Sequence, residues 1–232
     1  MRKLAVVILI VALGAVCGAK RPVVHKDADF NGKRVRQEAA VLILPERIDV
    51  QGPVVPDLVA NFDGDPGRSV QLLRDTLTDI LFGRGLCNLK ADEFGASGQS
   101  EFNFRAVESP AQRESLLACL EISRDEYGVA RATATAPDRL DSLLAAAGAT
   151  CLVLIDQLKL DRVATDRGSA VTGPYLSMEA ELTGQVLIWS SRSQSCVYNA
   201  YITGMRATKQ VNEKAIQELA CAFVRDLYQA LW

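Results

Sequence analysis

The side chains that most often carry out catalysis are scarce in this sequence. His25 is the only histidine, and no GxSxG, HExxH or phosphate-loop motif is present. His25 precedes the part of the chain that is expected to fold, which excludes a histidine-based catalytic triad or a histidine-rich metal site from that part. We therefore expect no catalytic residue, no metal site and no cofactor.

Acidic residues occur in three arrangements that can be associated with chemistry. Asp63 and Asp65 have the alternating spacing of calcium ligands, but the later glutamate of an EF-hand is absent, which favours a turn. Glu179 and Glu181 fall on one face of a predicted strand and are interpreted as the solvated face of a hairpin. Asp156 interrupts an apolar strand, which indicates a capped backbone group or a bulge.

Cysteines are the remaining reactive side chains, and the sequence contains six of them. No pair has the CxxC spacing of a zinc or redox motif. Apart from Cys17, they allow at most two disulfides, of open connectivity, among Cys87, Cys119, Cys151, Cys196 and Cys221. The alternative is burial as free thiols, which behave as small hydrophobic side chains and are inert in apolar surroundings.

The first seventeen residues have the order of a bacterial export signal. Arg2 and Lys3 precede the apolar run 4–13, and small residues follow. The run is too short to span a bilayer, which needs about 20 apolar residues. We therefore expect the mature protein to work outside the cytoplasm.

The end of this signal, 13–17 (LGAVC), resembles the lipobox of bacterial lipoproteins, in which the cysteine receives a diacylglycerol and becomes the new N-terminus. Val16 stands where the pattern has Gly, Ala or Ser. The resemblance implies lipidation at Cys17, an anchor made by acyl chains, and the periplasmic face of the outer membrane, since neither Gly18 nor Ala19 is acidic. The alternative is conventional cleavage after Ala19, which leaves a soluble periplasmic protein.

Length and composition predict one domain. The chain has 232 residues, of which 49% are hydrophobic, and its formal net charge is −2. No basic stripe is visible, so we expect no nucleic-acid partner. The predicted organisation is an export signal over 1–17, a tether over 18–37 and a single domain over 38–232; the oligomeric state is left open.

Hydrophobic periodicity predicts the elements that build this domain. Strands are expected over 39–44, 86–90, 150–163, 176–190 and 195–203, and helices over 69–82, 109–122, 137–147 and 211–231. Within the third strand, Leu152, Leu154, Leu158 and Leu160 are expected to share one face. The prediction is an α+β fold, a two-layer sandwich with a mixed or antiparallel sheet of about four to five strands and helices packed on one face.

Residues 45–68 are predicted to form a long loop because they contain four prolines and three glycines. The loop also carries apolar side chains, for which two interpretations stay open. They pack on the domain's own sheet, or they dock on another envelope protein as an added strand, through Val54, Val55, Leu58 and Phe62.

Three phrases resemble a group of bacterial envelope proteins that includes the curli-secretion lipoprotein CsgG, the penicillin-binding-protein activator LpoB and the N-terminal domain of TolB. They are the helix 70–82 leading into 86–90, Gly148-Ala149 before 151–160, and 182–186 (LTGQV). No long pore-forming insertion is present. The ABC-transport auxiliary lipoproteins have a similar element order.

This resemblance implies a non-enzymatic envelope lipoprotein that binds another envelope protein as a component of an assembly for cell-wall synthesis, secretion or transport. A soluble periplasmic ligand-binding module and an auxiliary lipoprotein of an ABC-type system are the alternatives. An enzyme that uses carboxylates or a free cysteine is the rival class.

Overall fold

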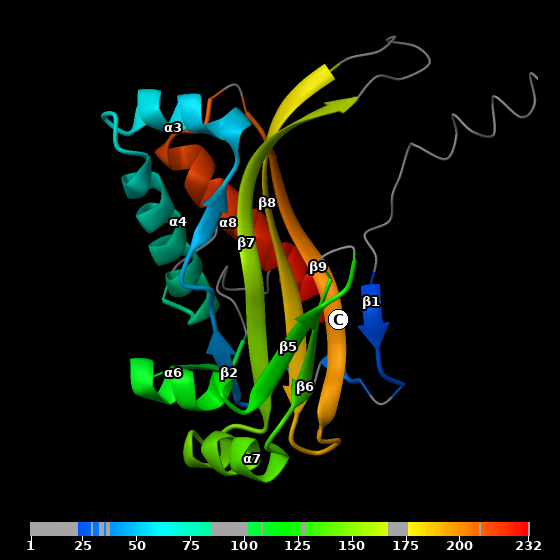
Figure 1. Ribbon diagram of the computed structural model, residues 1–232. Helices are drawn as coiled ribbons and strands as arrows, with labels where there is room; N and C mark the ends of the chain where they lie inside the picture. The colour runs from blue at the N-terminus through cyan, green and yellow to red at the C-terminus, as the bar shows by residue number, and fades with distance from the viewer. Residues whose placement is uncertain are drawn as a thin grey trace, which may run out of the picture.

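A mixed sheet of seven strands forms the middle of the molecule (Figure 1). The computed structural model describes residues 23–28, 30–32, 35, 38–84, 102–107, 109–126, 129–166, 176–208 and 210–231. The strands of the sheet are β1 (Val23–Lys26), β2 (Ala40–Ile43), β3 (Ile48–Val50), β4 (Phe104–Ala106), β7 (Cys151–Asp166), β8 (Leu176–Ser190) and β9 (Ser195–Ala207). Their order is β1-β9-β8-β7-β2-β4, and β3 pairs with β7 farther along that strand than β2 does.

The predicted α+β class is confirmed. β2 pairs parallel with β7 and β4, whereas β7, β8, β9 and β1 form antiparallel pairs. The sheet is larger than the predicted sheet of about four to five strands. The strands that the prediction lacked, β1, β3 and β4, have only three or four residues, which is too short for a hydrophobic period to be visible in the sequence.

The chain belongs to the sheet from Val23 on, which differs from the tether expected over 18–37. β1 pairs antiparallel with β9, with Lys26 opposite Tyr198. A polar edge strand of four residues is held by backbone hydrogen bonds to its neighbour and needs no apolar pattern of its own.

The residues that follow β1 pack on the domain as well. The Phe30 ring stacks on the Tyr198 ring with centroids 4.6 Å apart, and Val35 is 4% exposed. Gly32 lies so close to the carbonyl oxygen of Leu231 that any Cβ would collide with it. These contacts fix the start of the folded chain against the end of its last helix.

The strands β8 and β9 form the predicted hairpin, with a turn over 191–194. The alternation expected along β8 is confirmed, because its inward-facing apolar residues are fully buried in the main core. These residues are Ala180, Leu182, Val186 and Ile188.

A bulge divides β7 into two parts with opposite facing. Gln157 has a φ of 50°, and the register with β8 shifts directly after Asp156. The expectation of one shared leucine face is therefore wrong, since an extra residue turns the following side chains to the other face. Leu152 and Leu154 lie in the smaller core, whereas Leu158 and Leu160 lie in the main core.

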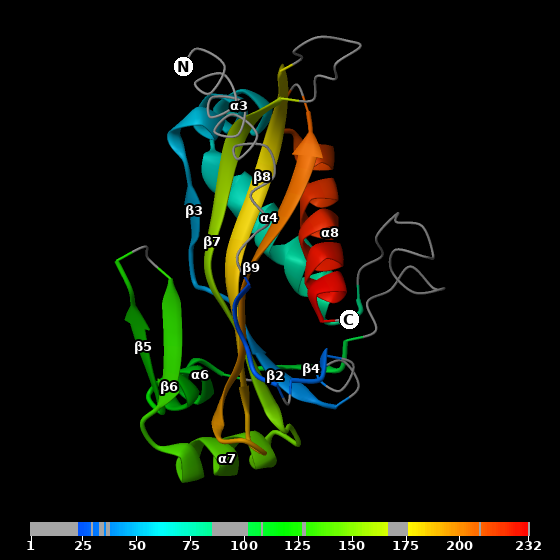
Figure 2. The same ribbon diagram turned by 90° about the vertical axis from the view of Figure 1, so that its right-hand side faces the viewer.

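One face of the sheet is covered by three helices, α3 (Val55–Asn61), α4 (Pro66–Leu81) and α8 (Glu213–Ala230). In Figure 2, α8 and α4 lie on one side of the sheet, and the strands β5 and β6 lie on the other. The apolar stripe predicted for the last helix is confirmed, since all seven of its residues are 0% exposed. They are Ile216, Leu219, Ala220, Phe223, Val224, Leu227 and Leu231.

Two glycines let α8 approach the sheet closely. A Cβ on Gly204 would lie 2.8 Å from the Leu219 carbonyl oxygen and 2.8 Å from the Phe223 Cα. A Cβ on Gly184 would lie 3.3 Å from the tip of the Phe223 ring. The Phe223 residue therefore packs over a gap in the sheet surface that only glycine provides.

The segment 45–68 is ordered into short elements, so the predicted long loop is wrong. It contains β3, a 3-10 helix over Gly52–Val54, the helix α3 and the start of α4. Three of its four prolines, Pro53, Pro56 and Pro66, stand in the first turn of a helix, where a missing N–H costs little and the fixed φ favours helix. Three of the residues that led to the loop prediction therefore begin helices.

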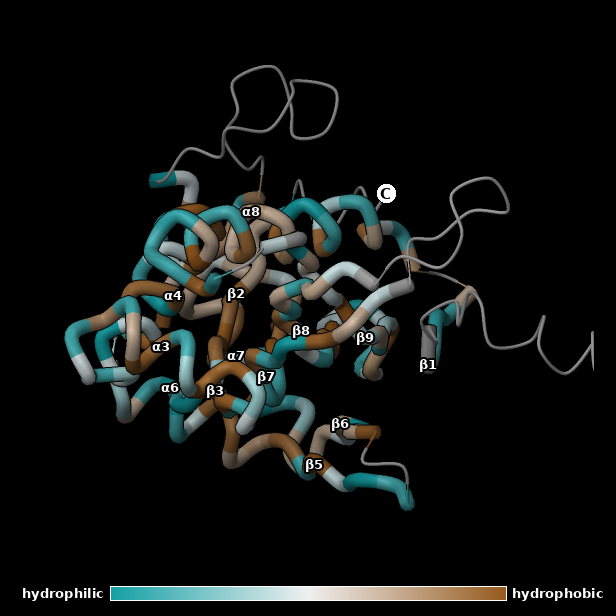
Figure 3. The backbone as a smooth tube through the Cα atoms, turned by 90° about the horizontal axis from the view of Figure 1, so that it is seen from above, coloured by the Kyte–Doolittle hydropathy of each residue, from teal (hydrophilic) through white to brown (hydrophobic). Residues whose placement is uncertain are grey.

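The second face is covered at one end, where the prediction expected a partly solvated surface. α6 (Pro110–Leu117), α7 (Pro137–Ala146) and the hairpin of β5 (Leu120–Arg124) and β6 (Ala130–Ala134) enclose a smaller core there. In the view from above, α8 and the β5–β6 hairpin lie on opposite sides of β7, β8 and β9 (Figure 3). The predicted helix 109–122 ends early because its last residues form β5; the predicted strand 86–90 lies outside the described residues.

Two buried amide side chains attach β6 to the sheet. Gln185 accepts a hydrogen bond from the Ala130 N–H at 2.8 Å, and its amide nitrogen donates to the Ala130 carbonyl at 2.8 Å. The Asn199 amide donates to the same carbonyl at 2.7 Å. These side chains satisfy the backbone N–H and C=O of one residue of β6 as a neighbouring strand would.

In the part of the chain that is described, no helix combines the length and the apolar character needed to cross a membrane.

Candidate functional site

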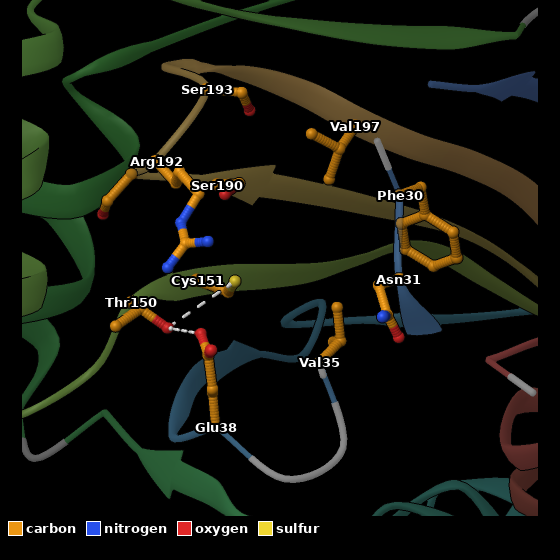
Figure 4. A pocket seen from close by; sticks show the side chains of 11 residues that line it. Phe30, Asn31, Val35, Glu38, Thr150, Cys151, Ser190, Arg192, Ser193 and Val197 are labelled. Carbon is orange, nitrogen blue, oxygen red and sulfur yellow. Dashed lines mark hydrogen bonds between the residues drawn. The ribbon is translucent and has the colours of Figure 1, made fainter. Parts of the chain in front are cut away.

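A pocket of about 660 Å³ opens at the end of the sheet where β7 begins and where the β8–β9 turn lies (Figure 4). It lies between that turn and the segment that joins β1 to β2. Its lining consists of Phe30, Asn31, Val35, Glu38, Thr150, Cys151, Ser190, Ser191, Arg192, Ser193 and Val197. Volumes of this size are typical of small-molecule sites.

The floor of the pocket is apolar. Val35, Cys151 and Val197 are buried side chains of the main core, and Phe30 adds a half-buried ring. Figure 4 shows Phe30 and Val35 on the side of the pocket opposite the turn. This floor can take an apolar group of a ligand, because contact with it removes apolar surface from water.

The rim of the pocket is polar and carries both signs of charge. Thr150 donates a hydrogen bond from its hydroxyl to Glu38 Oε2 at 2.8 Å. Four hydroxyls lie on this side of the pocket, from Thr150, Ser190, Ser191 and Ser193, together with the guanidinium of Arg192. In Figure 4 the Arg192 guanidinium points from the turn toward Thr150 and Glu38.

The turn that carries Arg192 is attached to its surroundings on two sides. The Ser191 N–H donates to the Thr150 carbonyl at 3.0 Å, and the Gln194 amide donates to Asp141 on α7 at 3.1 Å. Within the turn, the Ser195 hydroxyl donates to the Ser193 hydroxyl at 3.0 Å. The backbone of Arg192 is therefore held in place, although its long side chain is exposed.

A second hollow of about 330 Å³ lies between β9 and α8. Lys26, Tyr198, Tyr201 and Asp226 are among its lining residues. Burial raises the pKa of the Tyr198 hydroxyl, which therefore stays protonated beyond its ordinary range. The hollow is half the size of the first pocket and is wide open, so the first pocket is the better candidate site.

Three of the described cysteines form no disulfide, namely Cys119, Cys151 and Cys196. Cys221 is disulfide-bonded. Burial raises the pKa of the Cys196 thiol, although backbone hydrogen bonds partly oppose the effect. A raised pKa disfavours the thiolate, which is the nucleophilic form.

The four residues proposed to bind a partner lie mainly in the core. Val54 and Leu58 are 0% exposed and Phe62 is 3% exposed, while Val55 is half-buried. This is the self-packing arrangement that the sequence left open. The side chains of Val54, Leu58 and Phe62 are not on the surface of the folded domain.

The aspartates 63 and 65 have structural roles. Asp63 forms an exposed ion pair with Arg68 at 2.6 Å, and Asp65 caps α4 by accepting a hydrogen bond from the Gly67 N–H at 2.8 Å. The turn interpretation of this segment is confirmed. Asp156 lies at the predicted bulge and pairs with Arg124 of β5 at 2.6 Å.

The solvated-face interpretation fails for one glutamate of β8. Glu179 is 1% exposed, whereas Glu181 is half-buried. The pattern of the strand placed both residues correctly on the face away from α8. It gave no information about which segments far along the chain cover that face.

Sequence reasoning missed the pocket because its residues come from four separate segments and form no motif. Among the described residues, no three His, Cys, Asp or Glu side chains gather into a group that would hold a metal ion. Cys17, the predicted lipidation site, and Cys87 lie outside the described residues. The one available signal was the polar turn 191–194 directly after a strand, which was predicted only as a turn.

Together, the fold and the pocket define an α+β domain with a mixed sheet and a polar pocket at one end of it. No family model matches the sequence, and no curated protein matches it. A solved structure, that of the hypothetical protein CT253 from Chlamydia trachomatis, matches with 8% sequence identity and a TM-score of 0.31 over 73% of each chain.

Proposed function

We propose that this chain is a non-enzymatic lipoprotein of the bacterial cell envelope that acts by binding. The envelope part of the proposal is supported by the export-signal order of residues 1–17 and by the lipobox-like position of Cys17. The resemblance to CsgG, LpoB and TolB points to an accessory component of an envelope assembly.

The observation that carries the binding part is the pocket with both charges on its rim. It combines an apolar floor with a few polar groups that converge on one space, and this is the usual composition of a ligand site. The turn and strand ends that line it are held by backbone and side-chain hydrogen bonds. The site therefore needs little reorganisation to accept a ligand.

The anchor is tested by changing Cys17. The unchanged protein is expected to fractionate with membranes and to show the mass of a diacylglycerol on Cys17, whereas Cys17→Ala is expected to be released as an unlipidated protein. Membrane fractionation and intact-mass measurement give the result. Identical fractionation of both proteins, with a mature N-terminus at Lys20, would contradict the anchor.

A disulfide map gives an independent check. If Cys17 carries a lipid, Cys87 is the remaining cysteine that can pair with Cys221, because the other three form no disulfide. Peptide mapping without reduction is therefore expected to link Cys87 to Cys221. A Cys17–Cys221 link would exclude lipidation at Cys17.

A second candidate function is a soluble periplasmic ligand-binding module. The pocket volume of about 660 Å³ favours it, because volumes of this size are typical of small-molecule sites. The two functions differ in the mature N-terminus and in what co-purifies. Crosslinking of the processed protein in mild detergent captures an envelope protein in the first case and none in the second.

A further inference from the structure

We propose that the pocket binds a small zwitterion, namely a free amino acid or a dipeptide with an apolar side chain. The carboxylate is assigned to Arg192, the ammonium group to Glu38 and the side chain to the floor. This inference rests on the ligand-binding part of the proposed function and adds the chemical class of the ligand.

The ligand's carboxylate is assigned to Arg192 because of the orientation and the partners of its guanidinium. Within the described part of the chain, its guanidinium makes no ion pair or hydrogen bond, and it points into the pocket (Figure 4). Guanidinium groups bind carboxylates through two parallel hydrogen bonds. The hydroxyls of Ser190 and Ser193 line the same wall and can donate to a carboxylate as well.

The ammonium end follows from Glu38. Glu38 Oε2 already accepts a hydrogen bond from Thr150, and an ionised carboxylate has about four acceptor positions over its two oxygens. Asn31 also lines the pocket, on the side of Phe30 (Figure 4). Both groups accept hydrogen bonds, which an ammonium group supplies.

The charge balance of the pocket separates a zwitterion from simpler ions. Among the described residues of the lining, Glu38 and Arg192 are the charged ones, and they carry one charge of each sign. A simple anion would meet the repulsion of Glu38, and a simple cation would meet that of Arg192. A ligand with both charges gains from both residues and suffers from neither.

The size and floor of the pocket limit the rest of the ligand. Phe30, Val35 and Val197 offer apolar contact, and the volume of about 660 Å³ lies within the range for small ligands. An amino acid or a dipeptide with one apolar side chain reaches from the charged rim to this floor. A long polymer would not be enclosed.

The experiment is calorimetric titration of the processed full chain with four zwitterions: L-leucine, D-leucine, L-phenylalanine and L-alanyl-L-leucine. Two analogues each lack one charge, 4-methylpentanoate without the ammonium group and 3-methylbutylamine without the carboxylate. We expect at least one zwitterion to bind and both leucine analogues to bind at least about tenfold more weakly than that zwitterion. We expect Arg192→Gln and Glu38→Gln each to weaken the binding of that zwitterion by at least about tenfold.

Arg68→Gln and Glu121→Gln are the matched controls, since they remove the same charges at exposed positions outside the pocket lining. They are expected to leave binding unchanged. The proposal is overturned if no zwitterion binds at about 10 mM, well above the Kd of a weak specific ligand. It is also overturned if the analogues bind equally well, as for a simple ion, or if the pocket variants behave like the controls. None of these outcomes affects the fractionation or the disulfide map, so the envelope proposal is judged separately.

Discussion

Gly204 of β9 lets α8 pack closely on the sheet because it has no Cβ atom. The Gly204→Ala substitution places a methyl group against the backbone of Leu219 and Phe223, which cannot move unless the helix moves. We expect a loss of about 2–3 kcal/mol in the free energy of unfolding, the upper part of the range for overpacked cores. Urea unfolding followed by circular dichroism measures this loss.

Gly184→Ala is the matched control on the neighbouring strand. Its added methyl group would meet the side chains of Leu158 and Phe223 at 3.0 Å and 3.3 Å, and side chains can adjust. We expect a loss of about 1 kcal/mol. A loss at Gly184 equal to that at Gly204 would contradict the proposed backbone contact between β9 and α8.

The ion pair of Asp57 and Arg162 joins α3 to β7. Their side chains are 19% and 14% exposed, and the same Asp57 oxygen accepts a hydrogen bond from the Val211 N–H at 3.1 Å. Asp57→Ala leaves a largely buried guanidinium without its anion. We therefore expect a loss of about 2–4 kcal/mol in chemical denaturation, toward the range for broken buried pairs.

Arg68→Ala removes an exposed ion pair, that with Asp63, and is the control for Asp57→Ala. Exposed pairs are worth about 0–1 kcal/mol. Equal losses in the two variants would mean that the Asp57 pair is solvated and does not hold α3.

At the scale of elements, the β5–β6 hairpin depends on a small number of polar contacts. Gln185 and Asn199 satisfy the backbone N–H and C=O of Ala130 inside the protein. Gln185→Ala leaves the Ala130 N–H buried without a partner, at a cost of about 1–3 kcal/mol. We expect faster hydrogen exchange across β5 and β6 than in the unchanged protein, and unchanged exchange in the part of β8 and β9 that packs on α8.

Gln194→Ala is the control, because it removes an exposed amide that donates a hydrogen bond to Asp141, a residue outside the β5–β6 hairpin. It should leave hydrogen exchange in β6 as it was. Uniformly faster exchange throughout the sheet of the Gln185→Ala protein would show that Gln185 supports the whole core rather than the attachment of the hairpin.

The long elements were predictable from the sequence because their own pattern specifies them. The last helix has seven apolar residues at helical spacing, and β8 alternates over many residues, so each pattern determines both the type of element and its buried face. Ser109 and Pro110 likewise predicted the start of α6, where the Ser109 hydroxyl accepts a hydrogen bond from the Gln112 N–H.

The short elements were not predictable, since distant partners stabilise them. β1 and β3 are ordered by pairing with strands more than 100 residues away in the chain. The hydrophobic periodicity of a segment does not show which distant strand it pairs with. A bulge at Asp156 was one of two interpretations left open by the sequence, and its consequence, the reversed facing of Leu158 and Leu160, depends on the register with β8. The pocket combines four such segments, so its residues could be listed only after folding.

For the molecule as a whole, alkaline pH is expected to lower stability. Burial raises the pKa of Cys196 above its ordinary value of 9.0 and that of Tyr198 above 10.0. Groups with raised pKa contribute their full stability below the unfolded pKa and lose it as the pH rises toward the folded pKa. We therefore expect the contribution of these two groups to the free energy of unfolding to be constant up to about pH 9 and to decline above it.

Urea unfolding between about pH 7 and pH 10.5 measures this decline. The Cys196→Ala protein is expected to be less sensitive to pH just above the ordinary thiol pKa, because one of the raised groups is gone. Parallel curves for the two proteins would show that the thiol takes no part in the alkaline loss.

The pairing of β1 with β9 also limits where the molecule can work. Val23 is already fixed in the sheet, and only six residues of chain lead from Cys17 to it. At roughly 3.5 Å per residue, an extended segment of that length covers about 20 Å. A lipid on Cys17 would therefore keep the folded domain within that distance of the bilayer surface. Any partner or ligand would have to reach the domain there.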